Sequence, residues 1–152
     1  MKIIDWFLVL PFLLFLLLAY HSWKDIRYLY IETQDLILLG TYTLINAIIL
    51  AMNQEYEILY SNFLGSIVCL VIFLVVWFFT KKKGIGEGEL FYVPLAYFNI
   101  GLINAIEALY ICFFSAMLFA LVGLISKKLK KTQALPFIPF ISFGLIISLI
   151  YP

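Results

Sequence analysis

Six long apolar stretches follow one another along this 152-residue chain, and they limit the folds open to it more than any other feature. A helix needs about 20 apolar residues to cross the hydrocarbon core of a bilayer. Hydrophobic residues make up 65% of the chain and charged residues 12%, which is too little charge to solvate the surface of a water-soluble domain. The sequence therefore predicts an all-α, polytopic integral membrane protein. The stretches cover residues 6–22, 36–52, 58–80, 90–103, 106–126 and 136–151.

The fourth and fifth stretches form one apolar run, residues 90–126, which is far too long for a single crossing. Asn99, Gly101 and Asn104 supply the only turn chemistry within it, so we predict two helices joined by a tight connection. This gives about six transmembrane helices in a single membrane-embedded domain that covers residues 1–152.

Basic residues fix the expected orientation because lysine and arginine accumulate in cytoplasmic loops. Nine of the ten basic residues follow the first, third or fifth stretch, so these ends are predicted to face the cytoplasm and both termini the outside. The net charge of +1 gives no support for nucleic-acid binding. The nine residues are Lys24, Arg27, Lys81, Lys82, Lys83, Lys127, Lys128, Lys130 and Lys131.

The two cysteines, Cys69 and Cys112, each lie inside a long apolar stretch, where they are expected to act as packing residues. They form neither a CxxC metal motif nor a disulfide framework. No cofactor and no metal ion are therefore expected.

Acidic residues gather in the two predicted cytoplasmic segments, 24–35 and 81–89. Two carboxyl groups held close together cannot both ionise, so one pKa rises, and such a pair can activate water for peptide hydrolysis. Acids beside lysine runs are also common as solvated helix flanks, so spacing alone leaves both interpretations open. The five residues are Asp25, Glu32, Asp35, Glu87 and Glu89.

Residues 25–33 read Asp-Ile-Arg-Tyr-Leu-Tyr-Ile-Glu-Thr. This segment resembles the first motif of the type IV prepilin peptidases, D-x-R-x-x-x-I-P-N, at Asp25, Arg27 and Ile31. These enzymes are membrane aspartic proteases that remove leader peptides from pilin and pseudopilin precursors. Glu32 and Thr33 stand where the family usually has proline and asparagine.

The family's second motif, G-x-G-D, resembles Gly86-Glu87-Gly88-Glu89, with glutamate in the acidic position. Gly101, twelve residues further on, matches a glycine that family members often carry. Reading Gly84-Ile85-Gly86-Glu87 as the motif instead would make Glu87 the second acid. We favour the register that selects Glu89.

The resemblance implies that Asp25 and Glu89 form the catalytic pair, with Arg27, Gly86 and Gly88 as supporting motif residues. Glutamate is one methylene longer than aspartate, which moves the carboxylate by roughly 1.5 Å, and a shift of that size can lower a rate about a hundredfold. The lysine that commonly follows the second aspartate is replaced by Phe91. The resemblance therefore leaves open whether the site is active.

Leu135-Pro136-Phe137-Ile138-Pro139-Phe140 resembles the family's P-F-x-P-F stretch at the start of the last helix, where its expected role is structural. The likeness spans nearly the whole chain and implies the peptidase core without an N-terminal methyltransferase region. It implies a leader peptidase in the bacterial plasma membrane, acting at the cytoplasmic face on prepilins or pseudopilins of a pilus, secretion or competence system. The alternatives are an inactive prepilin-binding membrane protein and a small transporter or channel.

Three other polar residues have simpler interpretations. His21, the only histidine, is interpreted as interfacial rather than catalytic. Asp35 is expected to cap the second helix, where an acid meets the positive end of the helix dipole. Glu107 lies within an apolar stretch, which makes it a functional candidate, but its place beside the predicted external turn favours an interfacial flank.

Overall fold

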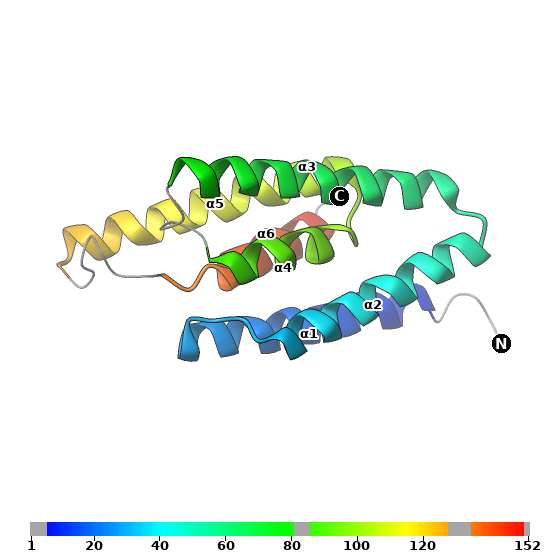
Figure 1. The fold of residues 1–152 in the computed structure, drawn as a ribbon, viewed down its shortest axis with the longest axis horizontal. Helices are drawn as coiled ribbons and strands as arrows, with labels where there is room; N and C mark the ends of the chain where they lie inside the picture. Colours follow the sequence, from blue (N-terminus) through cyan, green and yellow to red (C-terminus); the bar gives the residue numbers. More distant parts are fainter. Residues whose placement is uncertain (1–5, 81–85, 128–134, 151–152) are drawn as a thin grey trace.

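The computed structural model of the protein describes residues 6–80, 86–127 and 135–150, and these residues form six α-helices (Figure 1). No strand occurs among the described residues, so the all-α prediction is confirmed for this part of the chain. In chain order the helices are α1 (Trp6–Tyr28), α2 (Thr33–Met52), α3 (Tyr56–Phe79), α4 (Glu87–Tyr97), α5 (Leu102–Ile125) and α6 (Ile138–Ile150).

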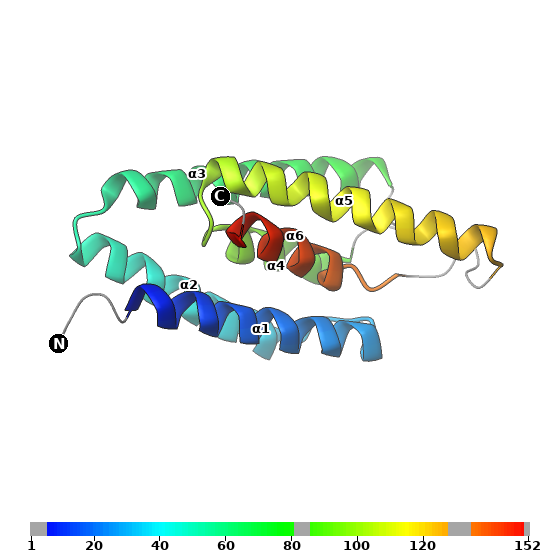
Figure 2. The same ribbon diagram turned by 180° about the vertical axis from the view of Figure 1, so that it is seen from behind.

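The helices alternate in direction along the long axis of the bundle and form three layers, as both views show (Figure 1, Figure 2). One outer layer contains α1 and α2, the other contains α3 and α5, and the short helices α4 and α6 lie between them. As a result the ends of α1 and α3 and the starts of α2, α4 and α6 lie toward the same end of the bundle, where the last turns of α5 project beyond the other helices (Figure 1, Figure 2). We call this end of the bundle the Asp25 end.

Four of the described helices, α1, α2, α3 and α5, are long and apolar enough to cross a membrane. The middle helices are shorter than the roughly 20 residues that a crossing needs, since α4 has 11 residues and α6 has 13. The six predicted helices are present, but length and composition support only four of them as independent spans. The middle pair lies between longer helices instead (Figure 1).

The connection between α4 and α5 explains why α4 is so short. The Asn99 side chain donates a hydrogen bond to the carbonyl of Leu95 at 2.9 Å, within the last turn of α4. Gly101 then adopts a φ of +76°, a left-handed conformation that favours glycine. The predicted turn residues Asn99 and Gly101 therefore do end the helix, whereas Asn104 lies inside α5.

Large apolar side chains cover the outside of the bundle, among them Ile125, Phe79 and Phe78, each more than three-quarters exposed. A water-soluble monomer rarely exposes apolar surface on this scale, so the long helices are those of a membrane-embedded protein. Cys69 and Cys112 are both buried and unpaired, in agreement with the packing role expected of them.

Candidate active site

Asp25 lies near the end of α1, and its side chain is buried, with 3% of the residue exposed. The Ile138 N–H donates a hydrogen bond of 2.9 Å to Asp25 Oδ2. The first N–H groups of a helix have no acceptor within it, so the start of α6 has a donor available for this carboxylate. The proline-containing segment before α6 therefore presents the backbone donor that holds Asp25, a role that the sequence did not indicate.

Glu89 lies in the first turn of α4, at the same end of the bundle, and is half-buried. The Gly86 N–H donates to Glu89 Oε2 at 2.9 Å, so the carboxylate also stabilises the start of α4. Burial raises the pKa of Glu89 to about 7, the Gly86 N–H opposes this shift, and the negative charge of Asp25 adds to it. The two acids thus interact electrostatically, whereas Glu87, the alternative second acid, is exposed.

The supporting motif residues occupy different surroundings. A Cβ atom at Gly88 would lie 3.2 Å from Ile31 Cβ, so a glycine here lets α4 approach the segment between α1 and α2 closely. Arg27 is exposed, and its guanidinium carbon lies 5.2 Å from the centre of the Trp23 ring. Arg27 therefore makes a cation–π contact at the surface.

A charged cluster next to the site joins α1 to α2. Lys24 Nζ lies 2.6 Å from Glu32 Oε2 and 2.9 Å from Asp35 Oδ2. The Glu32 N–H also donates to Asp35 Oδ2 at 2.9 Å, which confirms that Asp35 helps to cap α2. Glu32, which departs from the family motif, is the N-cap residue of this helix.

His21 is buried, with 1% of the residue exposed, so its interpretation as an interfacial residue is wrong. Its Nδ1 lies 3.3 Å from Tyr92 Oη on α4, and its Nε2 lies 3.9 Å from Asp35 Oδ1 on α2. The buried positions Leu14, Leu18, His21 and Asp25 recur every three or four residues, which is the spacing of one helix face. That periodicity was the available signal that His21 points into the bundle beside Asp25.

A further hydrogen bond joins α1 to α6 near Asp25. Ser22 Oγ donates to Ser142 Oγ at 2.8 Å. Tyr92, which contacts His21, is fully buried between these helices. A buried polar group inside a membrane protein is energetically unfavourable unless it forms hydrogen bonds or ion pairs. These polar contacts therefore link α1, α2, α4 and α6 at the Asp25 end.

Three other expectations concern residues or sites outside this cluster. Glu107 is exposed in the second turn of α5, at the end of the bundle opposite the acids. Among the described residues, no group of three or more histidine, cysteine, aspartate or glutamate side chains could hold a metal ion. Lys81, Lys82, Lys83, Lys128, Lys130 and Lys131 lie outside the described residues.

Comparison with known proteins leaves the family open. No protein-family model matches the chain, and no match is found among curated proteins or solved structures.

The raised pKa of Glu89 predicts a pH-dependent stability. Below pH 4.5 Glu89 is neutral in both the folded and the unfolded chain, and above pH 7 it is charged in both. Because the folded chain favours the neutral form, the free energy of unfolding should fall as pH rises from about 4.5 to about 7, by on the order of 3 kcal/mol.

Unfolding in detergent at several pH values, followed by circular dichroism, measures this slope. Glu89→Gln should remove the pH dependence, whereas Glu87→Gln, at an exposed position, should leave it unchanged. A pH dependence that persists in Glu89→Gln would contradict its attribution to Glu89.

Proposed function

We propose that this chain is a membrane aspartic endopeptidase that removes the leader peptide of type IV prepilins or pseudopilins. The observation that carries the proposal is that Asp25 and Glu89, 64 positions apart in the sequence, lie at the same end of the bundle, at the end of α1 and the start of α4. Asp25 is buried and Glu89 is half-buried, and the charge of Asp25 contributes to the raised pKa of Glu89. Two carboxyl groups held at one site, one of them with a pKa raised to about 7, are an arrangement that acid–base hydrolysis can use.

In this mechanism Asp25 takes a proton from a water molecule, whose oxygen attacks the carbonyl carbon of the scissile peptide bond. Glu89, with a pKa of about 7, is protonated in a large fraction of molecules at neutral pH and donates its proton to the leaving amine. The proton that Asp25 has taken then returns to Glu89 through solvent. The N–H groups of Ile138 and Gly86 hold the two carboxyl groups in place during these transfers.

The proposed topology places the Asp25 end at the cytoplasmic face of the bacterial plasma membrane, with both termini outside. It is supported by Lys24, Arg27 and Lys127, which lie at this end and would be cytoplasmic under the positive-inside rule. In this proposal α4 and α6 complete a six-helix membrane domain, and the long helices around them shield their ends from lipid.

The decisive experiment is leader removal from a co-expressed prepilin, followed by mass spectrometry of the pilin. Glu89→Gln keeps the side-chain length and an acceptor for the Gly86 N–H but cannot donate a carboxyl proton, so cleavage should fall by at least about a hundredfold. Glu87→Gln is the matched control and should cleave like the unchanged chain. Absence of cleavage in every form, or full cleavage by Glu89→Gln, would refute the proposal.

A second candidate, a prepilin-binding membrane protein without peptidase activity, is favoured by one specific contact. Glu89 reaches back to the Gly86 N–H, so its longer side chain is engaged with its own helix. Glu89→Asp distinguishes the two functions. Cleavage that appears only in Glu89→Asp, together with co-purification of the uncleaved precursor with the unchanged chain, would establish the binding protein.

A further inference from the structure

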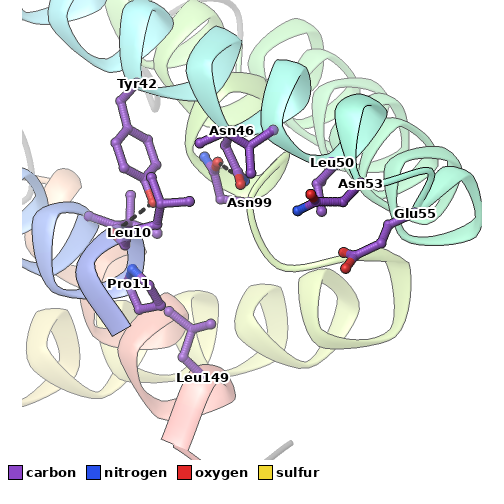
Figure 3. Close-up of a pocket in the computed structure, with 11 residues that line it drawn as sticks. Leu10, Pro11, Tyr42, Asn46, Leu50, Asn53, Glu55, Asn99 and Leu149 are labelled. Atoms are coloured by element: carbon purple, nitrogen blue, oxygen red, sulfur yellow. Dashed lines mark hydrogen bonds between the residues drawn. The ribbon is translucent and has the colours of Figure 1, made fainter. Parts of the chain in front are cut away.

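A cavity lies at the end of the bundle opposite Asp25, between α1, α2, α6 and the connection from α4 to α5 (Figure 3). Its volume is about 110 Å³, and a wider cleft of about 460 Å³ lies next to it, beside α3. The cavity and the cleft share Asn46, Leu50, Glu55, Asn99 and Leu149, so they are adjacent.

Most of the cavity wall is apolar. Leu10 and Leu14 on α1, Ile49 on α2 and Leu149 on α6 line it. The Tyr42 hydroxyl, which is also in the wall, donates to the Leu10 carbonyl at 2.8 Å and so offers no free donor to a ligand. Such a lining suits a hydrocarbon chain.

Glu55 supplies an unpaired acceptor at the mouth of the cavity. Its Oε2 atom is buried and accepts no hydrogen bond from the described residues. The basic side chains of the described residues, Lys24, Arg27 and Lys127, all lie at the Asp25 end, so none of them can neutralise this carboxylate. A buried acceptor without a donor is unfavourable, and a ligand that brings a donor would relieve that penalty.

Asn46 offers a second acceptor on the same wall. Its Nδ2 donates to Asn99 Oδ1 at 2.9 Å, which fixes the orientation of its amide group (Figure 3). The Asn46 Oδ1 atom receives no hydrogen bond from the described residues and is left for a ligand. The polar part of the cavity therefore combines the Glu55 and Asn46 oxygens with the Asn53 amide, beside an apolar lining.

We propose that this cavity binds a membrane lipid whose head group carries a primary ammonium. The ammonium brings a positive charge and N–H donors, which Glu55 Oε2 and Asn46 Oδ1 do not receive from the described residues, and part of an acyl chain fits against the apolar lining. A lipid is the occupant that fits the setting, because α1 and α2 are helices long and apolar enough to cross a membrane. The proposal depends on membrane embedding and not on the peptidase activity, since the cavity and the acid pair lie at opposite ends of the bundle.

The test compares two lipids on the purified full-length protein. Phosphatidylethanolamine and phosphatidylcholine with identical acyl chains have equal charge, but choline has no N–H donor. The protein is equilibrated with an equimolar mixture in detergent, and native mass spectrometry counts the lipids that stay bound. Ethanolamine lipid should be retained about tenfold more than choline lipid, because a charge-assisted hydrogen bond is lost with choline.

Glu55→Gln removes the charge at nearly constant shape and should reduce this preference about fivefold or more. Glu107→Gln is the matched control, because Glu107 is an exposed acid at the same end that does not line the cavity. Equal retention of the two lipids by the unchanged protein would overturn the proposal, whether or not the variants fold. A full preference in a folded Glu55→Gln protein would overturn it as well.

Discussion

Asp25→Asn is expected to reduce leader removal by about a thousandfold or more while leaving the stability of the bundle nearly unchanged. Asparagine keeps a side-chain oxygen that can accept the hydrogen bond from the Ile138 N–H, so the join between α1 and α6 survives. It cannot take a proton from water, so the proposed chemistry stops. The measurements are pilin mass after co-expression and thermal unfolding of the purified protein.

Asp25→Leu serves as the companion variant because it removes both functions of the carboxylate. The Ile138 N–H is then left without its acceptor at a buried position, and the free energy of unfolding should fall by about 1 to 3 kcal/mol. Cleavage that persists in Asp25→Asn would exclude this residue from the chemistry. Equal stability of the asparagine and leucine variants would show that the contact with α6 contributes little.

Gly144→Ala is expected to be among the most destabilising single-methyl changes in the protein. A Cβ atom at Gly144 on α6 would overlap the backbone carbonyl oxygen of Ala108 on α5, and the Cys112 nitrogen lies only 3.3 Å from it. Backbone atoms cannot rotate away, so the two helices must separate and lose their close packing. We expect the free energy of unfolding to fall by about 3 kcal/mol, measured by unfolding in mixed micelles with increasing dodecyl sulfate.

Gly40→Ala is the matched control for this change. Gly40 also lies within a helix, but a Cβ atom there would meet only the end of the Leu95 side chain, at 3.7 Å, an ordinary contact distance. Alanine also favours helix over glycine, by up to about 1 kcal/mol, so this variant should be as stable as the unchanged protein or more so. Similar losses in both variants would mean that the contact between α5 and α6 is looser than the structure indicates.

The sequence by itself determined that six helices form and roughly where, although α1 continues to Tyr28 rather than residue 22 and α4 ends at Tyr97 rather than residue 103. The apolar stretches predicted all six helices, and Asn99 and Gly101 correctly divided the longest run, because hydropathy and turn chemistry are properties of neighbouring residues. The same local patterns identified Asp25 and Glu89 as candidates, since each acid lies within a short motif. Local patterns also predicted that Asp35 caps α2, a contact formed within one turn.

Only the tertiary structure decided which of these residues meet. The hydrogen bond from Ile138 to Asp25 joins positions 113 apart, and it depends on which faces α1 and α6 turn toward each other. The burial of His21 and the short middle helices have the same origin, because a helix surrounded by other helices need not span a bilayer or keep its polar groups at the surface. Hydropathy depends on residues that are adjacent in the sequence. The acid pair and the proposed lipid cavity depend on contacts between residues that are far apart in the sequence.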